Sequence, residues 1–327
     1  MGAGSVRAVS SASGSDLAAR LRARDLSAAP EVLNLVENRA PEQRDEIAAL
    51  LGGVSPATLG GEPPGHVVGV TGPPGAGKSS LLSQLVPAWR ELGRSVAVLA
   101  VDPSSRRSGG ALLGDRARIA VDPADREVFV RSTAAGGRLG GLAPATRAAA
   151  HALAAAFDVV VIETVGVGQS EIDVAEAADT VAVVVQPAAG DVLQFLKSGI
   201  MEIPDVLVVT KADLGDPALQ AQRDLSAALR SIGERQTAVI AVSSLTPPTG
   251  FDHLVGALDS HREWIDVRAR RRATRRASAL ADFTTEHGER GLRALGGHRA
   301  AMKLLGEQDA ALDVPALTRA LEAVAAS

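Results

Sequence analysis

Short apolar runs recur through the middle of the chain, and a helical or loop stretch separates each run from the next. The runs are three to six residues long and carry apolar side chains at successive positions. Strands of this kind, buried on both faces and alternating with helices, are typical of a mainly parallel sheet covered by helices on both sides. The sequence therefore predicts an α/β fold. The predicted strands are residues 67–70 (VVGV), 96–101 (VAVLAV), 128–130 (VFV), 159–162 (VVVI), 180–185 (TVAVVV), 206–209 (VLVV) and 238–242 (AVIAV).

Helical patterns flank this region on both sides. Apolar residues return at helical spacing from Asp16 to Leu51, with breaks at Pro30 and Pro41, and a Gly/Pro-rich stretch follows at 52–65. Beyond Leu258 the pattern is helical to the end. We expect a disordered leader at 1–15, an N-terminal helical arm at 16–60, an α/β domain at 61–258 and a C-terminal helical arm at 259–327.

Composition narrows the class of protein. Apolar residues make up 46% of the chain and aromatic residues only 2%, so the core must consist of Val, Leu and Ala. There is no cysteine, which excludes disulfides, thiolate metal sites and thiol catalysis, and which suits a reducing cytoplasm. No apolar run approaches the roughly 18 residues of a membrane span. We expect a cytoplasmic protein without a membrane anchor.

The charge distribution gives no reason to expect nucleic acid as a partner. A formal net charge of −4 provides no long-range attraction for polyanions. The one basic stretch, residues 267–278 (VRARRRATRRAS), contains no aromatic side chain on which bases could stack. We expect this stretch to be a solvated or dimer-facing helix.

Lysine is rare and stands in short motifs. Only four of the 34 Lys and Arg residues are lysines, and three of these are Lys78 in GPPGAGKS, Lys197 in GDVLQFLK and Lys211 in TKAD. A compact ammonium on a flexible stem differs chemically from a planar guanidinium. A chain that otherwise uses Arg has kept Lys where this difference matters, which points to the handling of a nucleotide.

The first motif predicts a phosphate-binding loop. Residues 72–79 fit G-x-x-x-x-G-K-[ST], directly after a predicted strand and directly before a predicted helix that ends at Gly93. Glycines let successive backbone amides converge on phosphate oxygens, and the helix N-terminus adds partial positive charge. Lys78 would reach the β and γ phosphates, and Ser79 would ligate Mg²⁺. The predicted phosphate-binding residues are Gly72, Pro73, Pro74, Gly75, Ala76, Gly77, Lys78, Ser79 and Ser80.

Carboxylates follow two of the predicted strands. Asp102 and Glu163 come at the ends of the runs at 96–101 and 159–162, where ligands of open α/β sheets bind. There they could hold Mg²⁺, directly or through water, or orient an attacking water, although capping of the next helix is the alternative. Asp115 is a further metal candidate or a solvated loop carboxylate. Gly166 would let a backbone amide approach a γ-phosphate.

A third group of residues predicts a guanine pocket. In Thr210-Lys211-Ala212-Asp213, at a predicted strand end, the Asp213 carboxylate can accept hydrogen bonds from N1–H and the exocyclic amine of guanine. Adenine offers no such pair of donors, so Asp213 would be left unpaired. The Lys211 stem would lie along the purine face. Ser243, Ser244 and Leu245 either cradle the guanine carbonyl or form a plain turn. The predicted ligands are GTP and GDP.

The order of the motifs adds a resemblance. With the phosphate loop and TKAD, the segments VDPSSRRSGGALLGD, ETVGVGQSE and AAGDVLQFLKSGIMEIPD closely resemble the MeaB/ArgK family of SIMIBI-class P-loop GTPases. The resemblance implies chaperones of adenosylcobalamin-dependent acyl-CoA mutases, such as methylmalonyl-CoA mutase, that form homodimers through C-terminal helices. It places Asp102, Asp115 and Glu163 around the metal. It also implies switch roles for Gly166, Gln169, Asp191, Gln194 and Lys197.

Departures and alternatives accompany this resemblance. Thr210 stands where the family's guanine motif more usually has Asn, a change that signal-recognition GTPases tolerate. Among arginines near the switches, Arg107 is our first candidate to stabilise charge on the γ-phosphate, with surface solvation as the alternative. We expect slow intrinsic hydrolysis of GTP. A GTP-dependent metallocentre chaperone is disfavoured because there is no Cys and the six His are scattered, and an ArgK-type transport-associated kinase because no phospho-acceptor site stands out.

Overall fold

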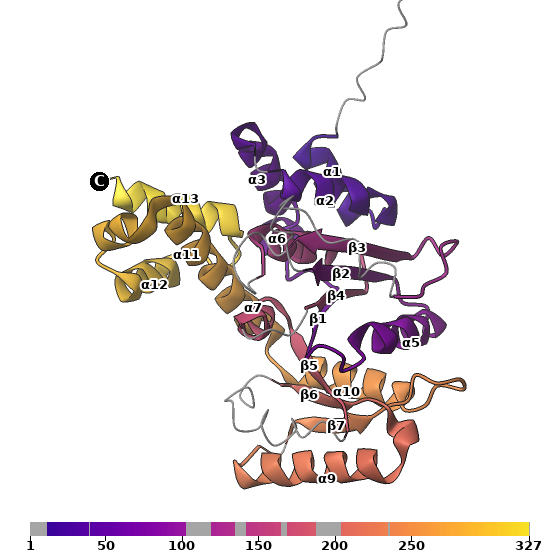
Figure 1. The fold of residues 1–327 in the computed structure, drawn as a ribbon. Coiled ribbons are helices and arrows are strands. Elements are labelled where there is room, and N and C mark those ends of the chain that lie inside the picture. Colours follow the sequence, from indigo (N-terminus) through magenta and orange to yellow (C-terminus); the bar gives the residue numbers. More distant parts are fainter. Residues whose placement is uncertain are drawn as a thin grey trace, which may run out of the picture.

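The computed structural model describes residues 12–38, 40–102, 119–134, 142–164, 169–187, 204–234 and 236–326. Within these residues seven strands form one sheet in the order β3-β2-β4-β1-β5-β6-β7, and all neighbouring pairs are parallel (Figure 1). The predicted α/β fold and all seven predicted strands are confirmed. The strands are β1 His66–Thr71, β2 Val96–Asp102, β3 Val128–Ala134, β4 Val159–Glu163, β5 Thr180–Val185, β6 Val206–Val209 and β7 Ala238–Ala241.

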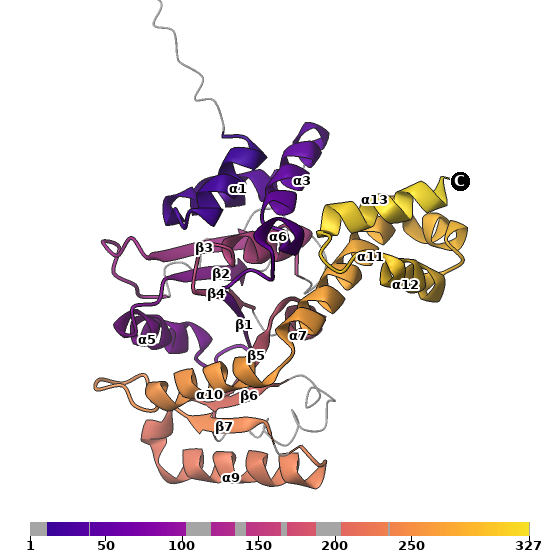
Figure 2. The ribbon, with the colours of Figure 1, turned by 180° about the vertical axis from the view of Figure 1, so that it is seen from behind.

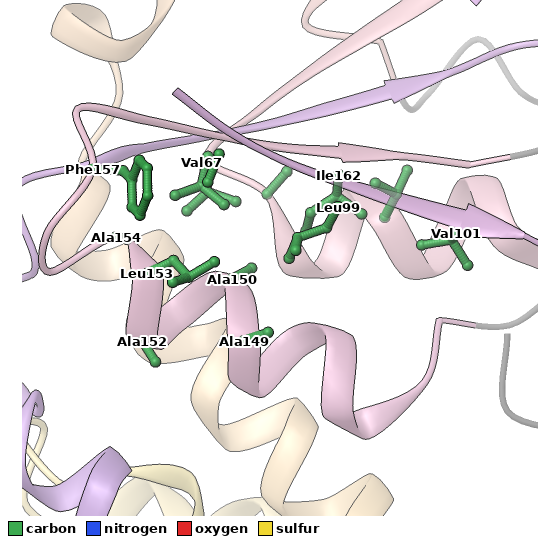
Figure 3. Packing of buried hydrophobic residues seen from close by; sticks show 14 of the residues in the cluster. Val67, Leu99, Val101, Ala149, Ala150, Ala152, Leu153, Ala154, Phe157 and Ile162 are labelled. Atoms are coloured by element: carbon green, nitrogen blue, oxygen red, sulfur yellow. The ribbon is translucent and has the colours of Figure 1, made fainter. Parts of the chain in front are cut away.

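Two hydrophobic cores lie on the two faces of the sheet, because successive strand residues point to opposite sides. Val68 and Val70 pack with α5 (Lys78–Glu91) and α10 (Phe251–Trp264). Val67 packs on the other face, with α6 (Pro144–Leu153), α7 (Gln169–Ala177) and α9 (Asp216–Ser231). Figure 3 shows Val67, Leu99 and Ile162 of this second core facing Leu153 and Ala150 of α6.

The N-terminal helices belong to the second core. Helix α2 packs directly on α6, and both contribute to that cluster of buried residues. Helix α1 begins at an N-cap, where the Ser13 side chain accepts a hydrogen bond from the Asp16 amide. The elements are α1 Gly14–Arg22, η1 Leu26–Ala28, α2 Ala29–Glu37, η2 Pro41–Gln43, α3 Arg44–Gly53 and α4 Pro56–Leu59.

The C-terminal helices have a small core of their own. Helix α11 (Val267–Ala294) leaves the sheet beside α7 and reaches α12 (His298–Glu307) and α13 (Val314–Ala325) (Figure 1 and Figure 2). Phe283, Leu305 and Leu321 are buried together in this third cluster. None of the helices in the part of the chain that the structure describes is both long and apolar enough to span a membrane.

The basic stretch of α11 differs from our expectation. We predicted a solvated or dimer-facing helix, but Arg271 and Arg275 are only 7% and 3% exposed. Arg275 donates two hydrogen bonds to the Glu62 carboxylate, at 2.8 and 2.9 Å. The prediction is wrong for these two residues. Each guanidinium binds a carboxylate from a distant part of the chain, and this pairing offsets the cost of removing the charge from water.

Candidate functional site

The phosphate loop connects β1, at the centre of the sheet, to α5. Gly72 has a φ of 142°, and a Cβ at this position would lie 2.1 Å from the carbonyl oxygen of Val184 on β5. Only glycine allows the loop to leave the sheet so close to the neighbouring strand. Gly77 caps α5 with a left-handed φ of 92°, so the amides of the first helical turn face the loop.

Lys78 is held over the loop by the loop's own backbone. Its Nζ donates to the carbonyl oxygens of Gly72 at 2.7 Å and Pro73 at 3.1 Å, and the side chain is buried. A buried ammonium needs such acceptors, since an unpaired charge would be strongly destabilising. The positive charge therefore lies within the concave loop, where a phosphate chain would bring negative charge.

Ser79 and Glu163, two of the predicted metal ligands, lie in contact at the start of α5. β4 pairs with β1 so that Glu163 lies opposite Val70, and Ser79 Oγ donates to Glu163 Oε1 at 3.1 Å. Glu163 is 4% exposed. A hydroxyl and a carboxylate at one point are ligands that Mg²⁺ accepts. Asp102 ends β2, the strand beside β4, and of this residue only the backbone is described.

Ser83 is a residue that the sequence analysis did not single out. Its hydroxyl donates to the Ser79 carbonyl oxygen at 2.9 Å and accepts from the Ala120 amide at 2.9 Å. It therefore connects the first turns of α5 with the chain that leads from β2 to β3. A serine four residues after Ser79 gives no signal by itself, because its partner Ala120 lies 37 residues away.

The strand end after β6 joins the predicted base pocket to the predicted phosphate loop. Thr210 Oγ1 donates to the Ala76 carbonyl oxygen at 2.7 Å and lies 3.2 Å from that of Val185. Thr210 is 3% exposed. The sequence analysis places Thr210 among the guanine-binding residues, which stays a prediction, and the structure adds that its hydroxyl links three segments of the site.

The predicted guanine-reading residues lie beside one another. Lys211 has a left-handed φ of 54°, and its Nζ donates to Gln186 Oε1 at 2.6 Å. Asp213, in the short helix η4 (Ala212–Leu214), accepts from Ser243 Oγ at 2.7 Å. A carboxylate oriented by a fixed hydroxyl and open to solvent suits recognition of two N–H donors. Gln186 is a second residue that the sequence analysis missed.

The turn after β7 contributes a serine and a backbone segment. The backbone groups of Ser243 and Thr249 exchange two hydrogen bonds, at 3.1 and 3.0 Å, which close the turn. The Leu245 amide approaches Ser243 Oγ at 3.3 Å, and the Leu245 side chain is 63% exposed. Ser243, Ser244 and Leu245 thus lie in one turn near Asp213, and their role toward a guanine carbonyl stays a prediction.

Several predicted residues are not placed. Gln169 begins α7, and its side chain is not described. Arg131 of β3, another arginine near the switches, binds Asn34 Oδ1 and Glu37 Oε2 of α2 at 2.9 and 2.6 Å, so it attaches the N-terminal helices to the sheet. Six predicted site residues lie outside the described part of the chain, namely Arg107, Asp115, Gly166, Asp191, Gln194 and Lys197.

Comparison with known proteins shows to which family the chain belongs. The family model for the methylmalonyl Co-A mutase-associated GTPase MeaB matches residues 29–292. A Mycobacterium tuberculosis protein described as a probable GTPase is 40% identical over 254 residues, which are 76% of this chain and 74% of that protein.

Two further matches come from a eukaryote and from a solved structure. The mouse mitochondrial methylmalonic aciduria type A homolog is 42% identical over 179 residues, 54% of this chain and 43% of that protein. The crystal structure of an LAO/AO transport system kinase is similar with a TM-score of 0.64 and 27% identity, over 96% of this chain and 98% of that one.

Proposed function

Since the chain belongs to the MeaB family of methylmalonyl-CoA mutase-associated GTPases, of the SIMIBI class of P-loop proteins, we propose that it couples GTP binding and hydrolysis to the service of an adenosylcobalamin-dependent acyl-CoA mutase. The service would be cofactor loading, protection or reactivation. The family description names a mutase, and the mouse relative is named after methylmalonic aciduria. The observation that carries the GTPase part is the loop after β1, where Lys78 binds the loop carbonyls and Ser79 binds Glu163.

The phosphate side of the site supports hydrolysis. The amides after Gly72 and at the start of α5 would bind phosphate oxygens, and Lys78 would exchange its loop carbonyls for the β and γ phosphates. Ser79, Glu163 and Asp102 are the residues that would hold Mg²⁺, which neutralises the charge of the phosphates when bound. The loop offers fixed charge and positioning, which are what phosphoryl transfer requires.

The base side supports guanine over adenine. Asp213 would accept hydrogen bonds from the N1–H and the amine of guanine, either in place of the bond from the Ser243 hydroxyl or in addition to it. Gln186 accepts a hydrogen bond from the ammonium of Lys211, and the stem of this lysine would lie along the face of the purine. The same site would serve a nucleotide-dependent kinase equally well, and the family match supports the GTPase.

The partner and assembly state are part of the proposal. We expect a homodimer formed through the C-terminal helices and slow intrinsic hydrolysis that a mutase partner accelerates. Magnesium and GTP or GDP are the expected ligands. The switch residues that the resemblance implies, including Asp191, Gln194 and Lys197, would carry the nucleotide state to the partner.

The test is a reconstitution with methylmalonyl-CoA mutase. Size-exclusion chromatography should show a complex whose stability differs between GDP and a non-hydrolysable GTP analogue, and the mutase should raise the hydrolysis rate. Transfer of adenosylcobalamin to the apo-mutase, followed by its visible spectrum, should depend on the nucleotide. Lys78→Ala should abolish hydrolysis. If Lys78→Ala hydrolyses GTP at the wild-type rate, the mechanism is wrong, and if no complex forms in any nucleotide state, the mutase role is wrong.

A further inference from the structure

Helix α11 is attached to the carboxyl end of α7, the helix that follows β4 and Glu163. Thr274 Oγ1 donates to the Glu176 carbonyl oxygen at 2.7 Å, and Arg270 Nε donates to that of Ala178 at 3.1 Å. Arg271 Nε donates to Asp179 Oδ1 at 2.8 Å. Three side chains within five residues of α11 thus bind the last turn of α7 and the link to β5. In Figure 1 and Figure 2 the two helices lie side by side.

The ion pair at the centre of this contact is buried and fully engaged. The side chains of Arg271 and Asp179 are 8% and 2% exposed. Arg271 also donates to the carbonyl oxygens of Pro63 at 2.6 Å and Gly65 at 2.5 Å, and the Val67 amide donates to Asp179 at 2.9 Å. Burial would raise the pKa of Asp179, but the charge and hydrogen bonds of Arg271 hold it below its usual value. A two-point charge-assisted contact of this kind fixes orientation as well as distance.

Arg270 makes a second contact, at the start of β6. Its guanidinium lies 3.0 Å from Asp205 Oδ2, and the same carboxylate accepts from the Val181 amide at 2.8 Å and contacts His261 Nε2 at 3.1 Å. Two consecutive arginines of α11 therefore bind the two points at which the chain re-enters the sheet, Asp179 before β5 and Asp205 before β6. The sequence between β4 and β5 carries Gly166 and Gln169, and that between β5 and β6 carries Asp191, Gln194 and Lys197.

The surroundings of the contact allow movement. Helix α7 has nine residues and is about 13 Å long, and it packs on β1, β5 and α11. A cavity of about 390 Å³ lies beside the contact and is lined by Ala177, Asp179, Arg271 and Thr274, together with residues of α3, α6 and α13. Packed cores resist small displacements, whereas a cavity provides volume into which α7 and α11 can shift together.

We infer that Arg270, Arg271 and Thr274 form a clamp that positions α7 and transmits the nucleotide state of the site to the C-terminal helices. This inference rests on the proposed function and names how that site is regulated. A displacement of α7 on exchange of GDP for GTP moves α11, and with it the small core formed by α11, α12 and α13. Because coupling between two sites is reciprocal, a partner that holds the C-terminal helices also changes nucleotide affinity.

The absence of cysteine makes a distance measurement straightforward. Spin labels on Arg223→Cys of α9 and Arg299→Cys of α12 mark the α/β domain and the C-terminal helices at two exposed positions. Pulsed electron paramagnetic resonance should show different label–label distances with GDP and with a non-hydrolysable GTP analogue. In an Arg270→Gln/Thr274→Val background this difference should be lost, and the GDP dissociation rate should change severalfold. Both clamp substitutions leave the buried Arg271–Asp179 pair in place.

A matched control separates the clamp from general loss of an arginine. Arg276, also on α11, donates to the Gly306 carbonyl oxygen at 3.0 Å, a contact within the C-terminal helices. Arg276→Gln should keep the distance change and a GDP dissociation rate within about twofold of the parent. Equal distances in both nucleotide states, with both nucleotides bound, would overturn the clamp and leave the proposed function intact. A clamp variant that responds like Arg276→Gln would overturn it as well. Failure to bind either nucleotide would overturn the proposed function, and the clamp with it.

Discussion

At the scale of single residues, the site is built by side chains that bind backbone groups of their own or a neighbouring segment. Lys78 binds carbonyls of its own loop, Ser83 joins α5 to the chain before β3, and Thr210 joins β6 to Ala76. The bonds of Ser83 and Thr210 each fix one segment relative to another. Preorganisation of this kind lowers the entropic cost of binding a nucleotide.

Thr210 offers a sharp test of this view. Thr210→Val keeps the shape of the side chain but leaves the buried carbonyl oxygen of Ala76 without its donor, at a cost of about 1–3 kcal/mol. We expect GDP affinity, measured by calorimetry, to fall about tenfold. Thr210→Asn is the control, since an amide can donate to the same carbonyl, and it should bind GDP within about threefold of wild type. Equal affinities of all three proteins would contradict a positioning role for the hydroxyl.

At the scale of elements, the sequence predicted what local patterns encode. Apolar runs predicted all seven strands because strands buried on both faces need apolar residues at successive positions. The strand–loop–helix order around residues 72–79 was predictable because the residues of this motif follow one another directly, and phosphate binding by the loop stays a prediction. Arg271 and Arg275 were not predictable as interior residues, because Asp179 and Glu62 lie 92 and 213 residues away in sequence. The order of polar and apolar residues along α11 does not distinguish these arginines from solvent-exposed ones.

The buried arginines predict a stability difference along one helix. Arg271→Met removes one partner of a buried ion pair and leaves Asp179 charged and uncompensated, so we expect a loss of about 3–5 kcal/mol in the free energy of unfolding. Arg276→Gln removes one bond of a partly exposed side chain and should cost less than about 1 kcal/mol. Urea denaturation followed by circular dichroism measures both. Similar losses in the two variants would mean that the burial of Arg271 has no energetic consequence.

At the scale of the whole molecule, three hydrophobic clusters and a few buried polar groups make up the interior of the described part of the chain. Two histidines, His66 and His151, are among the polar residues whose side chains are buried. Burial lowers the pKa of His66 and that of His151 from the usual 6.5 to about 3, so both are neutral in the folded protein at pH 7. His66 accepts or donates a hydrogen bond with Thr180 at 2.8 Å between β1 and β5, and His151 lies on α6.

These histidines predict how stability depends on pH. Below pH 6.5 both histidines take up protons in the unfolded chain, whereas in the folded protein they stay neutral until about pH 3. The free energy of unfolding is therefore highest above pH 6.5 with respect to these two groups, and it falls as the pH is lowered toward 3. Between pH 7 and pH 5 each histidine should remove about 2 kcal/mol of unfolding free energy. Urea denaturation at the two pH values measures the sum. His151→Leu should reduce the loss by about half, and a loss unaffected by this substitution would contradict the assignment.

The central claim is that residues 72–79 bind the phosphates of a nucleotide whose guanine is read by Asp213. Calorimetric titration of the nucleotide-free protein with GDP and with ADP, each with Mg²⁺, tests it most directly. We predict one GDP per chain, bound at least about tenfold more tightly than ADP. In Asp213→Asn this preference should disappear while the phosphate loop is unchanged. Equal affinity of the wild-type protein for GDP and ADP, or a preference that survives in Asp213→Asn, would contradict the account.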